Sequence, residues 1–185
     1  LLYEKSINEI RSLGFFKSVK SKIKEGSNEN FKIIEINVEE QPTGEMSLAA
    51  GYGTNGFATG GHIIEKNFLG KGVNLDTNIE VSQESLKGEF IYSVPNFAYT
   101  DNTLSTSVRS IDNDFLSLYG YKTREYGVSI GTRFEQFEKL FFSPELDFNI
   151  EDLSTNNKAS SNIKKQEGTY EDLYFNYGLN YDLRN

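Results

Sequence analysis

Strict two-residue alternation of apolar and polar side chains is the feature that most constrains this chain. The alternation begins near residue 44 and is clearest over residues 73–82, 125–134, 144–151 and 172–183. Successive side chains of a β-strand point to opposite faces, so this period predicts strands with one apolar and one polar face. Weaker alternation occurs at Met46–Tyr52, Phe57–Lys66, Leu86–Val94 and Leu104–Ile111. The sequence therefore predicts eight antiparallel strands after residue 44.

Two all-β architectures fit this alternation: a soluble β-sandwich, whose strands also alternate, and a membrane β-barrel. Several runs last ten residues or more. That length exceeds the usual globular strand and suits a tilted strand that crosses a bilayer. The predicted loops alternate between short, as at Glu84-Ser85, and long, as at Ser154–Glu167, which is typical of periplasmic turns and outer loops. Aromatic residues also gather near the predicted strand ends, at Tyr92, Phe97, Tyr99, Tyr119, Tyr121, Tyr170 and Tyr174. These features favour the membrane barrel.

The first 41 residues follow a different pattern. Apolar side chains at Tyr3, Ile7, Ile10 and Leu13 share one face of a predicted helix. Gly14 lies just past its end, where we expect a left-handed cap, with Phe15 or Phe16 packed into the core. Strands are predicted at 19–24 and at 31–38, joined by a turn at 26–28. One helix and one hairpin bury little apolar surface, so we expect further residues upstream.

Composition excludes several classes of protein. The chain has no Cys, which excludes a disulfide scaffold, a Cys-ligated zinc site and a thiol nucleophile. Its net charge of −8 argues against nucleic acid as a partner. An aromatic content of 14% argues against a disordered chain. No apolar run is long enough for a membrane-spanning helix.

Three local motifs suggest chemistry, and each fits a simpler explanation. Residues 51–56 spell GxGxxG with Asp76 downstream, but nucleotide binding also requires a helix after the third Gly, and Gly60-Gly61 disfavours one. His62, the only His, could act in a hydrolytic triad, but the sequence has no nucleophile elbow, so a His on one face of a strand is expected. Residues 112–114 resemble a calcium loop without its required Gly, so an acidic outer loop is expected. The sequence thus predicts no catalytic residue, no cofactor and no metal site.

Five segments, taken in order, resemble the BamA family of outer-membrane β-barrel assembly proteins. They are Ile7–Val19, Glu39–Gly53, Asn67–Gly72, Ser93–Phe97 and Phe175–Tyr181. The resemblance implies that residues 1–41 form the C-terminal part of a periplasmic POTRA domain, with helix, strand and strand. It implies that residues 42–185 form the N-terminal strands of a transmembrane β-barrel in the bacterial outer membrane. The family's second barrel half has no counterpart here, so a fragment cut at both ends is expected.

The resemblance also implies a function. BamA-like proteins are not enzymes; they fold and insert unfolded outer-membrane proteins without ATP, together with outer-membrane lipoproteins and in contact with the lipid bilayer. An incoming strand would pair with the first barrel strand, here Met46, Ser47, Leu48, Ala49, Ala50, Gly51 and Tyr52. The junction with the POTRA domain would be Pro42, Thr43 and Gly44. The small residues of this strand predict weak cross-strand packing, and hence an edge that is easily freed.

Three alternatives stay open at this level. Another POTRA-plus-barrel protein, for autotransporter assembly or two-partner secretion, shares the same architecture. A plain eight-strand outer-membrane barrel could act as a pore, an anchor or a barrel enzyme. A soluble all-β binding module would also show the alternation.

Overall fold

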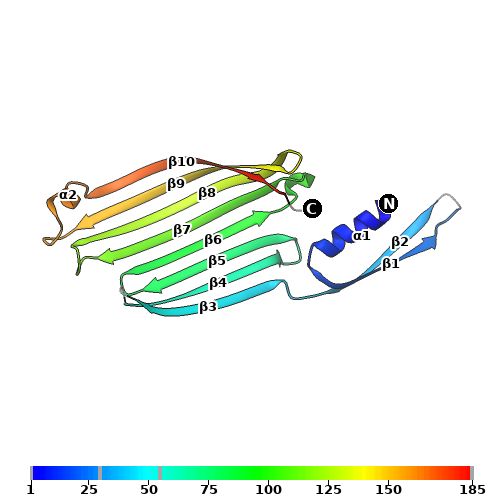
Figure 1. Cartoon of the computed structure of the whole chain (residues 1–185), viewed down its shortest axis with the longest axis horizontal. Coiled ribbons are helices and arrows are strands. Elements are labelled where there is room, and N and C mark those ends of the chain that lie inside the picture. Colours follow the sequence, from blue (N-terminus) through cyan, green and yellow to red (C-terminus); the bar gives the residue numbers. More distant parts are fainter. Residues whose placement is uncertain (1, 29–30, 54–55, 184–185) are drawn as a thin grey trace. The chain divides into compact units, whose positions relative to one another are not determined.

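A computed structural model describes residues 2–28, 31–53 and 56–183 of the chain (Figure 1). It divides into two compact units, Leu1–Gly44 and Glu45–Asn185. The division lies beside the Pro42-Thr43-Gly44 run, where Pro interrupts regular structure.

The smaller unit contains one helix and one hairpin. Helix α1 (Leu2–Ser12) has Glu4 in its first turn and Arg11 in its last, which suits the helix dipole. Strands β1 (Phe16–Glu25) and β2 (Lys32–Glu40) pair antiparallel. The expected helix and both strands are therefore present, and Gly14 has the expected left-handed backbone, with φ of 71°.

The core of the smaller unit differs from the expectation. Ile7 and Val19 are its buried apolar residues among those described, at 5% and 8% exposure. Phe15 and Phe16 are only half-buried and contact each other edge-on. The predicted packing of a Phe into the core is wrong, because neither ring is buried, and α1 bonds to β1 further along the strand, at Val19 and Ser21.

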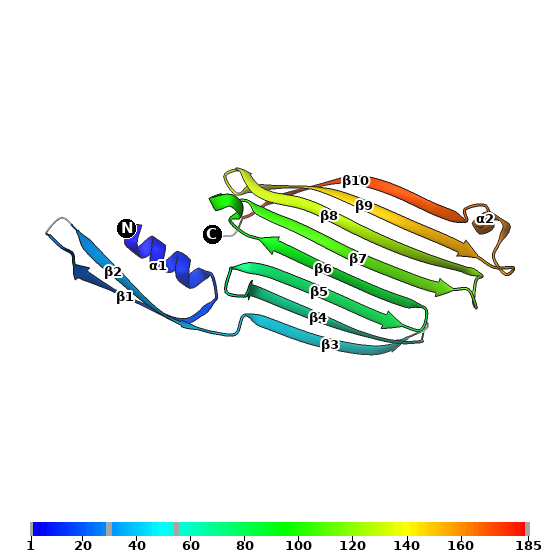
Figure 2. The same ribbon diagram turned by 180° about the vertical axis from the view of Figure 1, so that it is seen from behind.

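The larger unit is one antiparallel sheet in which every strand pairs with its sequence neighbours (Figures 1 and 2). The eight predicted strands are confirmed. They are β3 (Gly44–Gly53), β4 (Gly56–Phe68), β5 (Val73–Ser82), β6 (Ser85–Val94), β7 (Thr103–Phe115), β8 (Tyr121–Phe137), β9 (Leu140–Thr155) and β10 (Gly168–Tyr181). Two short helices lie in connections: η1 (Phe97–Tyr99) between β6 and β7, and α2 (Ser161–Lys164) between β9 and β10. The sheet is open, with β3 and β10 at its edges.

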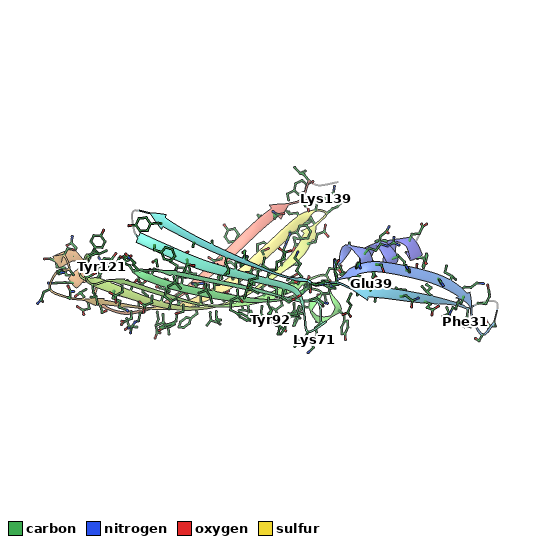
Figure 3. All side chains as sticks on the ribbon, turned by 90° about the horizontal axis from the view of Figure 1, so that it is seen from below. Phe31, Glu39, Lys71, Tyr92, Tyr121 and Lys139 are labelled. Atoms are coloured by element: carbon green, nitrogen blue, oxygen red, sulfur yellow. The ribbon has the colours of Figure 1, made fainter. Side chains whose placement is uncertain are left out.

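The two faces of this sheet have inverted burial compared with a water-soluble protein. On β8, Val128 and Ile130 are 55% and 51% exposed, whereas Ser129 between them is 5% exposed. Ser107, Asp147 and Asn149 are buried on the same face as Ser129. Figure 3 shows the sheet curved, with Tyr92 of the apolar face on its outer, convex side. Curvature crowds the polar side chains together on the inner face and spreads the apolar ones apart.

Strand register aligns the side chains of the apolar face, mostly large apolar residues with some Thr, into rows across the sheet. The longest row links Ile63, Thr77, Phe90, Val108, Val128, Phe148 and Leu173 on seven neighbouring strands. A second row contains Leu75, Tyr92, Thr106, Ile130, Leu146 and Phe175. Such rows form a continuous apolar band on one face, as a lipid-facing wall requires.

The predicted alternation of short and long loops is wrong. Because neighbouring strands run in opposite directions, the short Gln83-Glu84 turn and the long connection 156–167 lie at the same end of the sheet. The opposite end carries the 69–72 turn, the η1 connection and the Glu138-Lys139 turn. Loop length therefore does not separate the two ends of this sheet.

Candidate functional site

The predicted strand-pairing residues Met46–Tyr52 all lie in β3, at one edge of the larger sheet (Figure 1). Every residue of β3 is exposed, in contrast to the mixed burial of the interior strands. Pro42 and Thr43 directly precede the strand, and Gly44 is its first residue. The structure thus places these residues on a strand whose second backbone edge has no partner among the described residues.

Among the residues that the structure describes, few side-chain contacts attach β3 to its neighbour β4. The Thr59 hydroxyl donates to the Ala49 carbonyl at 3.1 Å, and the Lys66 ammonium lies 3.8 Å from the Glu45 carboxylate. A Cβ built on Gly51 would meet no atom within 4 Å. Small side chains on an edge strand contribute little cross-strand packing, so β3 is held mainly by its backbone hydrogen bonds.

The backbone of Ala49 and Ala50 has a defined direction. The Ala49 carbonyl accepts from Thr59 of β4, so it points toward the sheet. Because the N–H and C=O of one strand residue point the same way and alternate along the strand, those of Ala50 point toward the open edge. Within the described sheet, Ala50 therefore presents a backbone donor and acceptor to any further strand.

Two successive glycines in β4 leave both faces of the sheet without a side chain beside this edge. Gly60 and Gly61 lack side chains on opposite faces, and a hollow lies over each face here. Leu48 bends over the apolar-face hollow, with its Cδ2 only 3.2 Å from where a Cβ of Gly61 would lie. On the polar face the hollow is bordered by Ser47, Ala49 and His62. The region behind β3 is thus more loosely packed than the middle of the sheet.

The middle of the sheet is held by a polar network that sequence reasoning missed. Arg109 of β7 donates from Nε to Glu125 at 3.0 Å and from Nη2 to Asp147 at 3.0 and 3.2 Å, and it also bonds Asn149. Gly127 lies directly opposite Arg109, and a Cβ there would come within 2.8 Å of the guanidinium. Beside the network, the buried hydroxyls of Ser107 and Ser129 bond at 2.7 Å. These contacts tie β7, β8 and β9 together.

The other motifs have structural roles. Gly56 begins strand β4 rather than a helix, so the GxGxxG run lacks the context that nucleotide binding needs. Asp76 instead lies 2.7 Å from the ring of His62 on the next strand. Asp112 and Asp114 are not in a loop as expected; they lie within β7 and pair with Arg124 and Lys122 of β8. Within residues 2–28, 31–53 and 56–183, no cluster of His, Asp and Glu has the arrangement of a metal site.

Comparison with known proteins identifies the class. A family model described as the Omp85 superfamily domain matches residues 67–185, which is 119 of the 185 residues. The chain therefore belongs to the Omp85 superfamily. Comparison with curated protein sequences gave no match.

Solved structures show which fold within this class the chain resembles. The crystal structure of BamA from Haemophilus ducreyi lacking POTRA domains 1–3 superimposes with a TM-score of 0.76 and 21% sequence identity. The match covers 97% of this chain and 38% of that structure. The chain thus has the fold of part of BamA and spans about two fifths of the length of that relative. In the described part of the chain, no helix is long and apolar enough to cross a membrane.

Proposed function

We propose that this chain is part of an outer-membrane protein assembly factor, which folds and inserts β-barrel proteins by pairing their strands with β3. The observation that carries the proposal is a fully exposed edge strand in a sheet of inverted burial, within the Omp85 superfamily. The role is one of templating rather than chemistry, so we propose no catalytic residue, no cofactor and no need for ATP.

The apolar band supports a lipid-facing wall. On β8 it runs from Tyr126 to Phe134, beyond which Arg124 occupies the same face. Five alternate positions span about 27 Å along a strand and about 20 Å in height at the usual tilt. This is close to the ~25 Å apolar band of outer-membrane barrels.

We further propose residues 1–41 as the C-terminal part of a POTRA domain in the periplasm and residues 42–185 as the first barrel strands in the outer membrane. The helix and hairpin of the smaller unit match the end of that domain in element order. The Pro42-Thr43-Gly44 run would then be the junction between domain and barrel. Partners would be unfolded outer-membrane proteins, outer-membrane lipoproteins of an assembly complex and the surrounding bilayer.

Strand addition at β3 follows from its backbone. An unpaired strand edge recruits other strands, and soluble proteins suppress it with charge, Pro or bulges. Met46–Tyr52 contains neither a charged residue nor a Pro. An extended segment added here would gain backbone hydrogen bonds at Ala50, as in other cases of β-augmentation.

The proposal is tested with the full-length protein reconstituted in phospholipid vesicles without nucleotide. An outer-membrane barrel diluted from urea is the substrate, and its protease-resistant fraction is followed over time. Ala50→Pro removes a donor at the open edge and should slow insertion by about tenfold or more while leaving the β4 ladder intact.

Ala49→Pro is the matched variant, because the same substitution one residue earlier removes a donor that faces β4. It should lower the stability of the β3–β4 pair. Insertion by the Ala50→Pro protein at the wild-type rate would refute strand pairing at β3. No acceleration by the wild-type protein over empty vesicles would refute the assembly function itself.

A further inference from the structure

The connection between β9 and β10 is basic in an otherwise acidic chain. Residues 156–167 contain Lys158, Lys164 and Lys165 but only one acidic residue, Glu167, whereas the whole chain has a net charge of −8. The three lysines are exposed. Glu167 accepts a hydrogen bond from the Thr155 hydroxyl at 2.8 Å. The connection is thus a local positive patch, named here the lysine loop.

The lysine loop is fixed in place by the turn between β7 and β8. The Asn156 backbone N–H donates to the Gly120 carbonyl at 2.8 Å, and its side chain donates to Leu116 at 2.9 Å. Ala159 is 7% exposed, and a Cβ on Gly120 would collide with its backbone. Ser160 caps α2 with its side chain. The lysines are therefore presented from a defined platform.

Two lysines of this loop bond to backbone carbonyls rather than to carboxylates. The Lys158 ammonium donates to the Ser117 carbonyl at 2.9 Å, and that of Lys164 returns to the Asn157 carbonyl at 3.3 Å. Among the residues that the structure describes, none of the three lysines has a carboxylate at ion-pair distance. Three positive charges in a 12-residue connection, without a carboxylate partner in the described part of the chain, attract an anion from outside.

The other basic side chains at this end of the sheet are paired. Lys122 lies 2.9 Å from Asp112 and 3.3 Å from Asp114, and Arg124 lies 3.2 Å from Asp112. These residues lie just beyond the apolar band, since Tyr126 and Ile150 form its last row. The lysine loop follows further out along β9, past the end of the band.

We infer that the lysine loop binds the phosphate groups of lipid head groups at the outer surface of the membrane. The inference rests on the proposed function, because only that orientation places the loop at the outer surface. Lysine is a common phosphate ligand, and each exposed Lys or Arg near an anionic surface adds to the attraction. The aromatic cluster of Phe115, Tyr119 and Tyr121 lies beside the platform, as expected at a membrane interface.

The test uses the full-length protein in nanodiscs of phosphatidylcholine with a minor fraction of bisphosphorylated lipid A. Native mass spectrometry measures how much lipid A stays bound. The triple variant Lys158→Gln, Lys164→Gln and Lys165→Gln should lower lipid A retention by about tenfold or more at low salt. The difference should shrink at high salt, because exposed charges are screened.

Two control proteins interpret the result. Lys20→Gln with Lys22→Gln and Lys24→Gln makes the same charge change on β1 and should retain lipid A like the wild type. Replacing the three loop lysines with Arg keeps the charge and should keep the retention, which separates charge from folding. Equal retention by the loop Gln variant and the wild type overturns the inference. If the Gln variant still inserts substrate normally in that case, the assembly function stands and only the lipid contact falls.

Discussion

Strands β3 and β8 belong to one sheet but differ sharply in how firmly side-chain contacts hold them. β8 has 17 residues, lies between two partners and carries Ser129 at 5% exposure beside the Arg109 network. β3 has 10 residues, is exposed throughout and has open space where Gly51 would carry a side chain. The comparison indicates that this sheet combines a rigid wall with an edge that costs little to rearrange. An assembly factor that pairs with incoming strands needs both.

The largest expected difference between the two strands appears when one glycine in each is replaced with valine and the losses of stability are compared. Gly127→Val on β8 forces a side chain into the Arg109 guanidinium and displaces it from Glu125 and Asp147. Arg109 is only 20% exposed, so we expect a loss of about 3–5 kcal/mol in the free energy of unfolding, as for a broken buried ion pair. Urea titration of the full-length protein in vesicles measures it.

Gly51→Val on β3 is the matched control, because a Cβ there meets nothing within 4 Å. Its effect should stay within about 0.5 kcal/mol, as for other surface substitutions. Similar losses for the two valine variants would show that the wall and the edge are not packed differently.

The next largest expected effect is the loss of stability when an arginine is placed on the apolar face of the sheet. Ile130→Arg places a charge on the apolar face of β8 and should cost about 2–4 kcal/mol if that face meets the middle of the bilayer. Asn78→Arg lies on the polar face opposite Glu89, where the new charge finds a partner, and should cost much less. A similar loss of stability for the two variants would refute the assignment of faces.

Ser129, the obvious polar-face neighbour of Ile130, is a poor control. The sequence predicts that Ser129 faces a wet lumen, where an arginine would cost little. The structure places it at 5% exposure in a hydrogen bond with Ser107, so an arginine there meets steric resistance.

Substitution of a third glycine, Gly14, tests backbone strain without any steric clash of the new Cβ. Gly14 also has nothing within 4 Å of a built Cβ, but its φ is 71°. Gly14→Val should therefore destabilise α1 by about 1–2 kcal/mol through strain alone. Hydrogen exchange of the α1 amides measures the loss, and Gly14→Asn, which tolerates this conformation, should lose less. Unchanged exchange in the valine variant would contradict the role of Gly14 as a cap.

Much of the fold follows from local patterns in the sequence. Alternation predicts all eight strands of the sheet because one face is apolar along the whole strand. It underestimates their length: the pattern indicates 125–134 for β8, which extends over Tyr121–Phe137. The missed residues include Lys122 and Arg124, which carry charge onto the apolar side past the end of the band.

Other features depend on contacts that no local pattern contains. The partners of Arg109 are 16, 38 and 40 residues away, so the network appears only once the strand register is known. The local sequence hints at the network only through Gly127, which takes a position between Glu125 and Ser129 on the polar face of β8. The same reason explains the misassignment of Asp112 and Asp114 to a loop, since their cationic partners lie on the next strand. The place of β3 at the edge of the sheet, by contrast, can be predicted, because β3 is the first strand of a sheet in which sequence neighbours pair.

Cysteine crosslinking tests the central claim, that β3 is the edge that receives a substrate strand. The chain has no native Cys, so single probes in this part of the protein have no background from it. Ser47→Cys or Ala49→Cys is placed in the full-length protein, and a second Cys is placed in the last strand of a substrate barrel stalled during assembly. Oxidation should join them only at matching positions, because a disulfide needs Cα atoms roughly 4.4–6.8 Å apart. Asn78→Cys on β5 is paired on both sides, with β4 and β6, and should not crosslink. Crosslinking of Asn78→Cys as efficient as that of the β3 probes would contradict the account.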